Sequence, residues 1–142
     1  MTTDTTSIDT VIQPPSVAEY LKLRREGELR AFSPEAAEIG LKGTLFAVTL
    51  RHENEAIGMG RIVGDGGCFV QIVDIAVDPR FRGKGLGKRI MASLMEWAKN
   101  ELPETTFLSL FADIPADKLY AQFGFTETAP KSLGMSCRVT RT

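Results

Sequence analysis

The chain has 142 residues, 17 Lys and Arg against 18 Asp and Glu, a net charge of −1 and one His. This length predicts one domain with its own core, and the near-neutral charge argues against general binding to nucleic acid or to an anionic membrane. Two Cys residues and a single His exclude a disulfide scaffold, a zinc ribbon and a His-rich metal site.

No apolar run reaches the length of a membrane span, and the first ten residues, MTTDTTSIDT, lack the pattern of a signal peptide. We therefore expect a cytoplasmic protein that has no membrane partner. The polar, Thr-rich residues 1–7 are expected to form a flexible tail, and residues 8–142 are expected to form a single domain.

The predicted elements follow in the order strand, helix, helix, three strands, helix, strand, helix and strand. Their approximate ranges are 8–13, 17–28, 34–40, 44–51, 56–63, 68–77, 86–101, 105–111, 115–123 and 131–139. Ser16 and Glu19 form a capping box, and Ser33 before Pro34 is a second helix start. This order predicts a mixed α/β domain around one sheet.

Burial is predicted from the spacing of apolar residues. Positions 86, 90, 94 and 98 share one helix face, and residues 68–77 are apolar on both faces, as in a covered central strand. Phe107 and Phe111 are expected in the core, and Cys68 and Cys137 are expected to be small apolar fillers. Arg24, Arg25 and Arg30 are expected on a solvated helix face.

The segment from Arg80 to Arg89 (RFRGKGLGKR) joins the apolar strand to the next helix and holds three alternating glycines and five cations. Glycines allow a tight turn whose amides point at an anion, and a helix N-terminus adds positive potential. The composition therefore predicts a phosphate or pyrophosphate site. The spacing matches neither G-x-x-x-x-G-K-[ST] nor G-x-G-x-x-G, and leaves R-x-x-G-x-G at Arg82, Gly85 and Gly87.

With this loop, two further segments make the sequence resemble the GCN5-related N-acetyltransferase (GNAT) superfamily. Residues 73–79 (VDIAVDP) are similar to the family's fourth strand, and residues 119–125 (LYAQFGF) to its L-Y-x-x-x-G-F element. The resemblance spans about residues 57–125, and it implies the GNAT acyl-CoA N-acyltransferase fold, with the element order predicted above.

The resemblance also implies which residues bind acetyl-CoA. Main-chain groups of the strand would pair with the pantetheine arm, and amides of the loop would hold the pyrophosphate. The family often has Asn seven residues before the Tyr of L-Y-x-x-x-G-F, at the start of a helix, where this chain has an Asp. The expected cofactor-binding residues are Ile75, Ala76, Val77, Arg82, Gly83, Lys84, Gly85, Leu86, Gly87, Lys88 and Asp113.

Two catalytic residues are expected from the same resemblance. Tyr120 would stand near the thioester sulfur and protonate the departing thiolate; the alternative is a core tyrosine whose hydroxyl bonds a carbonyl. Asp74, the only acid in an apolar strand, would take a proton from the amine, directly or through a water. The alternative for Asp74 is a structural carboxylate that holds neighbouring backbone or Arg61.

The expected function is transfer of an acetyl group from acetyl-CoA to a primary amine by direct attack, without a metal. The acceptor, a small molecule or a peptide, is not identified by the sequence. An acyl-CoA-binding sensor without turnover is an alternative, and a nucleic-acid module that uses residues 80–89 is a weaker one because the chain is slightly acidic and lacks interleaved aromatic residues. The oligomeric state is open, and a homodimer is one assembly that the sequence allows.

Overall fold

The computed structural model describes residues 5–141, apart from the side chain of Thr6. Contacts divide the chain into two compact units, the first ending at Leu110 and the second beginning at Phe111. The expected flexible tail lies partly outside the described residues (1–4), whereas Thr5–Ser7 form a short 3-10 helix.

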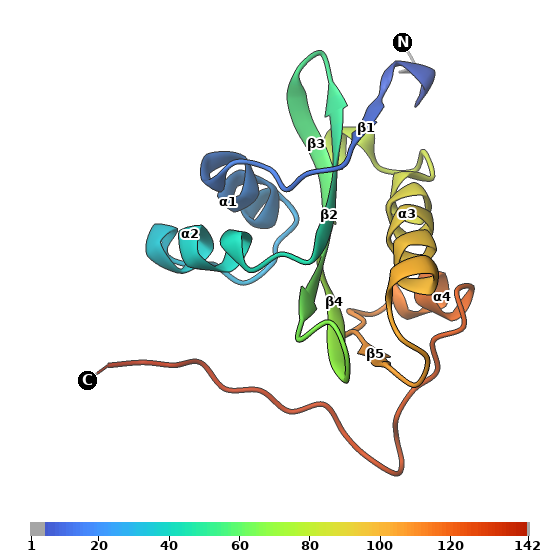
Figure 1. The fold of residues 1–142 in the computed structure, drawn as a ribbon. Coiled ribbons are helices and arrows are strands. Elements are labelled where there is room, and N and C mark those ends of the chain that lie inside the picture. Colours follow the sequence, from blue (N-terminus) through green and yellow to red (C-terminus); the bar gives the residue numbers. More distant parts are fainter. Residues whose placement is uncertain (1–4, 142) are drawn as a thin grey trace. The chain divides into compact units, whose positions relative to one another are not determined.

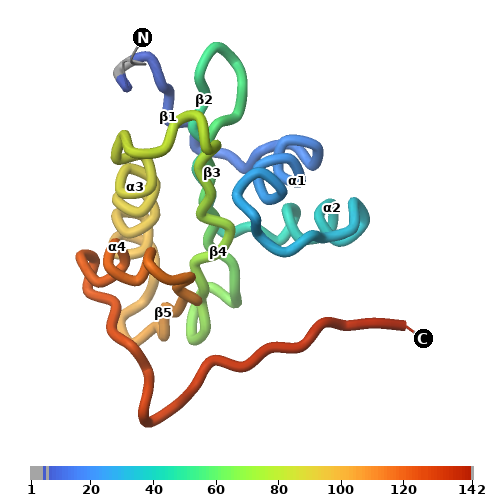
Figure 2. Tube along the Cα trace, turned by 180° about the vertical axis from the view of Figure 1, so that it is seen from behind, coloured from blue at the N-terminus to red at the C-terminus, as the bar shows by residue number. Residues whose placement is uncertain are grey.

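A five-stranded sheet with strand order β1-β2-β3-β4-β5 organises the first unit (Figure 1). Neighbouring strands are antiparallel except β4 and β5, which are parallel. Helices α1 and α2 lie on one side of the sheet and α3 lies on the other, as the view from behind confirms (Figure 2). The elements are β1 (Asp9–Val11), α1 (Val17–Glu26), α2 (Pro34–Lys42), β2 (Phe46–His52), β3 (Glu55–Gly64), β4 (Phe69–Val77), α3 (Leu86–Glu101) and β5 (Phe107–Ser109).

The helix starts predicted from sequence are confirmed. The Glu19 amide donates to Ser16 Oγ at 3.2 Å, and the Ser16 amide donates to Glu19 Oε1 at 3.0 Å, which completes the capping box of α1. At the start of α2, the Ala36 amide donates to Ser33 Oγ at 3.1 Å, so the Ser33 side chain caps this helix. Both helices therefore begin where local hydrogen bonding places them.

The core between α3 and the sheet also follows the predicted pattern. Leu86, Ile90, Leu94 and Ala98 are all buried along one face of α3. Gly60 of β3 lies beneath this face, and a Cβ built on Gly60 would come within 2.6 Å of Ile90 Cγ2. The absence of a side chain at Gly60 thus allows α3 to pack close to the sheet.

β4 contains an irregularity that shapes the site. Ala76 pairs with Met59 but Val73 pairs with Arg61, so one extra residue is inserted on β4, and Asp74 there has a left-handed φ of +63°. β5 pairs only with Phe69, Val70 and Gln71 of β4. Within the described part of the first unit, the second half of β4 therefore has no strand on its β5 side.

The second unit differs most from the sequence predictions. It contains α4 (Asp117–Ala121), shorter than expected, and residues 132–141 form no helix or strand, so the strand predicted at 131–139 is wrong. A strand needs a neighbouring strand for its backbone hydrogen bonds, and none of those described pairs with this segment. The expected core positions of Phe107 and Phe111, and the expected filler role of both Cys residues, are also wrong, because all four side chains are exposed.

Candidate active site

The loop between β4 and α3 has the conformation that its glycines predict. Gly83 and Gly85 have φ angles of +79° and +75°, and a Cβ on either would meet no atom within 4 Å. Gly85 is the N-cap of α3 and supplies no side-chain cap. The glycines therefore hold a backbone turn beside open space, as a ligand-binding loop requires.

The first amides of α3 are available to a ligand. In the first backbone hydrogen bond of α3, the Arg89 amide donates to the Gly85 carbonyl at 3.1 Å. The N–H groups of Leu86, Gly87 and Lys88 precede this bond and have no carbonyl of the helix to donate to. Among the residues that the structure describes, these three amides have no acceptor. Unsatisfied amides and the helix dipole at one point favour an anion such as a phosphate group.

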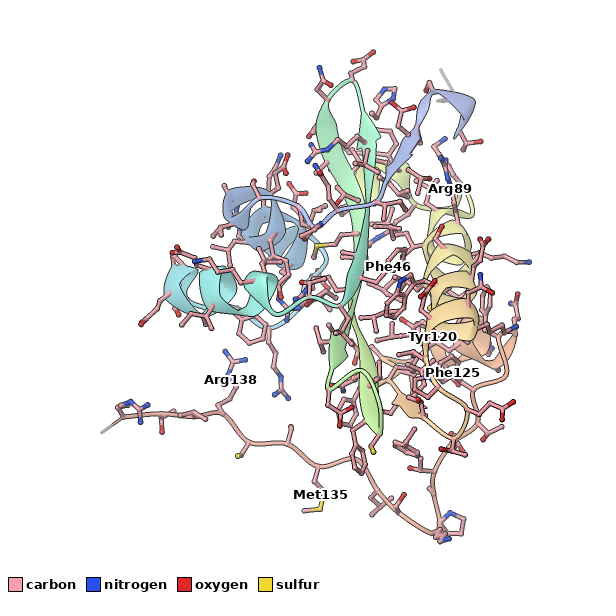
Figure 3. The ribbon with its side chains drawn as sticks, viewed as in Figure 1. Phe46, Arg89, Tyr120, Phe125, Met135 and Arg138 are labelled. Carbon is pink, nitrogen blue, oxygen red and sulfur yellow. The ribbon has the colours of Figure 1, made fainter. Side chains whose placement is uncertain are left out.

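The five cations of the loop segment divide into two groups. Arg80 binds Asp78 at 2.8 Å and Glu55 at 2.6 Å, and its hydrogen bond holds the pKa of Asp78 below the usual range. Arg89 extends from α3 to β1, where it donates to Thr10 Oγ1 at 3.0 Å (Figure 3). Within residues 5–141, Arg82, Lys84 and Lys88 make no ion pair.

The end of β4 presents the predicted pantetheine-binding residues. The Asp78 amide donates to the Ile57 carbonyl of β3 at 2.8 Å, and Met59 pairs with Ala76. Because backbone groups alternate between the two edges of a strand, Ala76 faces β3 and Val77 faces the open edge. Ile75 directly follows the irregularity at Asp74. Val77 is thus the residue best placed to pair with an added strand-like group.

Asp74 is the centre of a buried charged cluster. Its side chain is 3% exposed and accepts from Arg24, from Arg61 Nε at 2.8 Å and from the Tyr20 hydroxyl at 2.9 Å. Burial, and next the Asp74 carboxylate, raise the pKa of Tyr20 above its ordinary value. The contact between Asp74 and Arg61 matches the structural alternative considered from sequence.

Both arginines are fixed by further contacts. Arg61 donates to the Gly40 carbonyl at 3.0 Å and to Thr44 Oγ1 at 2.7 Å, and Arg24 donates to the Arg30 carbonyl at 3.0 Å. The centroid of the Phe32 ring lies 4.4 Å from Cζ of the Arg24 guanidinium group. The cluster therefore connects α1, the loop after α1 and the C-terminal part of α2 to β3 and β4.

Sequence reasoning did not connect Tyr20 or Arg24 with Asp74. Arg24 was expected on a solvated helix face but is buried, whereas Arg25 and Arg30 are exposed as expected. Tyr20 and Arg24 lie four residues apart on α1, so they share the helix face that also carries Leu23 toward the core. The pattern that could have revealed this cluster is a cation at a helix position that faces the core, four residues from a tyrosine.

Tyr120 and Asp113 belong to the second unit. Tyr120 lies on α4 and is partly buried, and its hydroxyl makes no hydrogen bond within the described residues. Burial, and next the charge of Asp113, raise the pKa of Tyr120 above its ordinary value. Asp113 does not cap α4, whose N-cap is Ala116; instead, the Asp113 carbonyl accepts from the Ala116 amide at 2.7 Å.

Comparison with known proteins decides the family. The profile described as "Acetyltransferase (GNAT) family" matches residues 15–125. The chain belongs to the GNAT acetyltransferase family. The match covers α1, the whole sheet after β1, the glycine loop and the L-Y-x-x-x-G-F element of this GNAT chain.

Several relatives agree with this assignment. A crystal structure from methicillin-resistant Staphylococcus aureus, of a protein of unknown function described as a probable acetyltransferase, has 43% identity and a TM-score of 0.89, with 93% of this chain and 99% of that chain covered. YobR, an uncharacterised N-acetyltransferase of Bacillus subtilis, is 32% identical over 70% of this chain and 42% of its own length. The uncharacterised N-acetyltransferase ycf52 of Porphyra purpurea is 28% identical over 69% of this chain.

This GNAT chain thus spans only 58% of the Porphyra protein that it matches. No helix among the described residues is both long enough and apolar enough to cross a membrane. The same residues contain no group of three or more His, Cys, Asp or Glu side chains that could hold a metal ion.

Proposed function

We propose that this GNAT protein transfers an acetyl group from acetyl-CoA to a primary amine, a small molecule or a peptide. The observation that carries the proposal is the start of α3, where Gly85 is left-handed and three amides have no acceptor among the described residues. A pyrophosphate fits there, with Arg82, Lys84 and Lys88 beside it. Asp113 remains a further proposed cofactor contact.

The amine substrate attacks the thioester carbonyl carbon directly, so that a C–N bond forms and the C–S bond breaks. In this scheme, backbone amides near Ile75, at the end of β4, stabilise the negative charge that develops on the carbonyl oxygen. Tyr120 gives its phenolic proton to the departing thiolate. A phenol has an ordinary pKa of about 10, and burial raises the pKa of Tyr120 above it, so the proton is in place at neutral pH.

An alkyl ammonium has a pKa of about 10.4 and must lose a proton before it attacks. The sequence-based hypothesis gives this proton to Asp74. The contacts of Asp74 favour a positioning role instead, because three donors from Arg24, Arg61 and Tyr20 already occupy its carboxylate. We therefore propose that Asp74 holds the two arginines and that solvent or another group accepts the proton.

The alternative function is that of an acyl-CoA sensor without turnover, which would use the same cofactor-binding residues. Release of free thiol from acetyl-CoA in the presence of an amine panel separates the two functions. An enzyme is expected to release thiol only when both substrates are present, in step with a mass increase of the amine. Tight acetyl-CoA binding without thiol release for any amine would instead support the sensor.

The site assignment is tested by Gly85→Val with Gly66→Val as its matched control. Both glycines have almost the same φ, +75° and +76°; a Cβ built on Gly85 meets no atom within 4 Å, and one on Gly66 meets only Leu45 Cδ2 at 4.0 Å. A side chain in the left-handed region costs about 1–2 kcal/mol or more, so both variants should lose similar stability. Only Gly85→Val is expected to lose acetyl-CoA affinity in calorimetry. Unchanged affinity in a folded Gly85→Val protein would contradict the site.

A further inference from the structure

Two buried arginines on one side of the sheet share a single carboxylate. Arg24 and Arg61 both donate to Asp74, and the ion pairs among the described residues give neither arginine a second acid. The side chains of the two arginines are 10% and 8% exposed, and that of Asp74 is 3% exposed. The cluster therefore contains two cations and one anion. Because an uncompensated charge is costly to bury, this imbalance favours a further anion.

Arg61 has a terminal nitrogen with no acceptor. Its Nε donates to Asp74, and its Nη1 donates to the Gly40 carbonyl and to Thr44 Oγ1. Its Nη2 makes no hydrogen bond with any residue that the structure describes. Nη2 is also not among the fully buried side-chain atoms that lack a partner in the described part of the chain, so it can be reached from outside the cluster. A guanidinium nitrogen can only donate, and Nη2 is thus the atom at which an anion can bind.

Gly40 of α2 leaves space beside this nitrogen. A Cβ built on Gly40 lies 4.0 Å from Arg61 Nη2. Apart from its chain neighbours and the backbone of its own helix, this Cβ meets no other atom within 4 Å. Glycine is a poor helix former, so its presence inside α2 lowers the stability of the helix. In return, no side chain of residue 40 fills the approach to Nη2.

The charge and shape of the cluster favour a carboxylate. Arg24 is held by Asp74 and by the Arg30 carbonyl, to which its Nε and Nη2 donate at 3.0 and 2.9 Å. Because both arginines share one carboxylate, a single additional negative charge balances the cluster. The N–H groups along a guanidinium edge match the two oxygens of a carboxylate. A monoanionic carboxylate therefore fits better than a doubly charged phosphate.

The cluster adjoins the proposed reaction site. Asp74 directly precedes Ile75, and a strand rises about 3.3 Å per residue, so Val77 lies at most about 10 Å from Asp74 along β4. Acetyl-CoA is proposed at the start of α3, whereas α1 and α2 lie on the opposite side of the sheet (Figures 1 and 2). The amine can therefore approach the thioester from the side on which Arg24 and Arg61 lie.

We propose that the acceptor of this GNAT protein is a small amine that carries a carboxylate, such as an amino acid, and that Arg61 and Arg24 bind this carboxylate. The inference rests on the proposed function and names its substrate class. Asp74 then has a defined purpose, because it fixes both guanidiniums in the orientation that the acceptor requires.

Matched pairs of amines test the proposal on the parent protein. Phenylalanine with phenethylamine, lysine with cadaverine, and γ-aminobutyrate with propylamine each differ only in the carboxylate. At least one carboxylate-bearing member is expected to bind in calorimetry and to release thiol from acetyl-CoA, with kcat/KM about tenfold or more above that of its partner. Equal or higher values for the decarboxylated partner in every pair, or neither binding nor turnover of any carboxylate-bearing member, would overturn the proposal.

Gly40→Asp and Gly40→Asn are the matched variants. Gly40→Asp places a permanent carboxylate beside Arg61 Nη2, and it is expected to raise the Kd and KM of the carboxylate-bearing amine about tenfold or more. Gly40→Asn has nearly the same shape without the charge and should raise both values much less. Circular dichroism confirms that the variants are folded. Equal effects of the two substitutions would assign the loss to space rather than to charge and would contradict the proposed site.

Binding and turnover are measured separately, so the two proposals can fail separately. Thiol release without any preference for a carboxylate would retain the acetyltransferase function and overturn this inference. Binding of a carboxylate-bearing amine that Gly40→Asp weakens and Gly40→Asn preserves, without thiol release from any amine, would support the carboxylate site and contradict the enzymatic function.

Discussion

Three residues at the candidate site have left-handed backbone angles: Asp74, Gly83 and Gly85. For the glycines this conformation is nearly free of cost, whereas for Asp74 it costs free energy that the surrounding contacts must offset. Aspartate and asparagine are enriched among the non-glycine residues that adopt this region. The three hydrogen-bonding partners of Asp74 account for its persistence in that conformation.

Replacement of Asp74 by Asn separates its two candidate roles. A positioning role predicts a large loss of stability, about 3–5 kcal/mol, because two buried guanidiniums lose their counter-charge. It also predicts a loss of turnover of equal size at every pH. Thermal unfolding and a pH–rate profile are the measurements. A folded variant whose turnover recovers in alkaline buffer would show instead that Asp74 accepts the amine proton.

Tyr20→Phe is the matched control for this variant. It removes one hydrogen bond to Asp74 but leaves the charges of Asp74, Arg24 and Arg61 unchanged. We expect a loss of about 1 kcal/mol, well below that of Asp74→Asn. Similar losses in the two variants would mean that the hydroxyl, rather than the charge balance, holds the cluster together.

Tyr120→Phe tests the proposed acid. The substitution removes one hydroxyl and retains the ring, so stability and acetyl-CoA affinity should stay close to those of the parent. General acid catalysis contributes about 10²–10⁴-fold, so turnover should fall at least tenfold. Steady-state kinetics and calorimetry on the same preparation give both quantities. Parental turnover would assign Tyr120 to packing, and loss of cofactor binding would give the hydroxyl a structural role.

At the scale of elements, α1 is attached to the sheet by a second charged pair. Glu19 of the capping box accepts from both terminal nitrogens of Arg51 in β2 at 2.8 Å. The hydrogen bond from Arg51 lowers the pKa of Glu19 to about 2. The same carboxylate therefore caps the helix and fixes the helix to β2.

The stability contributed by Glu19 should depend on pH. Its folded-state pKa lies below its ordinary value, so the contribution is present above about pH 4.5 and disappears as the pH falls toward 2. Glu19→Gln should therefore be less stable than the parent at pH 7 and approach it at pH 2. Denaturant unfolding of both proteins across this range measures the difference.

Glu38→Gln is the control for this prediction. Glu38 forms only an exposed pair with Lys42 on α2, with side chains 65% and 78% exposed. Exposed pairs contribute about 0–1 kcal/mol, so this variant should stay near the parent at all pH values. A difference between parent and Glu19→Gln that does not change with pH would contradict the proposed ionic contribution.

The packing of α3 on β3 depends on Gly60. A methyl group there would overlap Ile90 Cγ2 and lie 3.1 Å from Leu94 Cδ1, so Gly60→Ala should destabilise the protein by about 1–3 kcal/mol. Gly67→Ala is the control, because the nearest atom to its built Cβ is 3.9 Å away. Thermal unfolding distinguishes the two. Equal stability of both variants would show that α3 can move away without cost.

At the scale of the whole molecule, the family match and the strand predicted at 131–139 lie in different parts of the chain. The GNAT profile ends at residue 125, before the predicted strand begins. The glycine loop, Asp74 and the sheet belong to the first unit, and Tyr120 belongs to the second.

Elements with local signals could be predicted from the amino-acid sequence. The capping box at Ser16 and the helix from Leu86 to Glu101 depend on residues close together in the chain, and both are confirmed. The GNAT family was recognisable for the same reason, since its motifs are short and occur in a fixed order. Local hydrogen bonding and helical periodicity are readable without knowledge of the tertiary structure.

The surroundings of charged residues and of sheet edges could not be predicted from the sequence. Arg24 is buried because Asp74, 50 positions later in the chain, provides its counter-charge, and no local pattern encodes that pairing. Residues 131–139 have the alternation of a strand, yet a strand forms only where a second backbone lies beside it. Hydrophobic periodicity and secondary-structure propensity depend on residues that are neighbours in sequence, whereas ion pairs and strand pairing depend on residues that are neighbours in space.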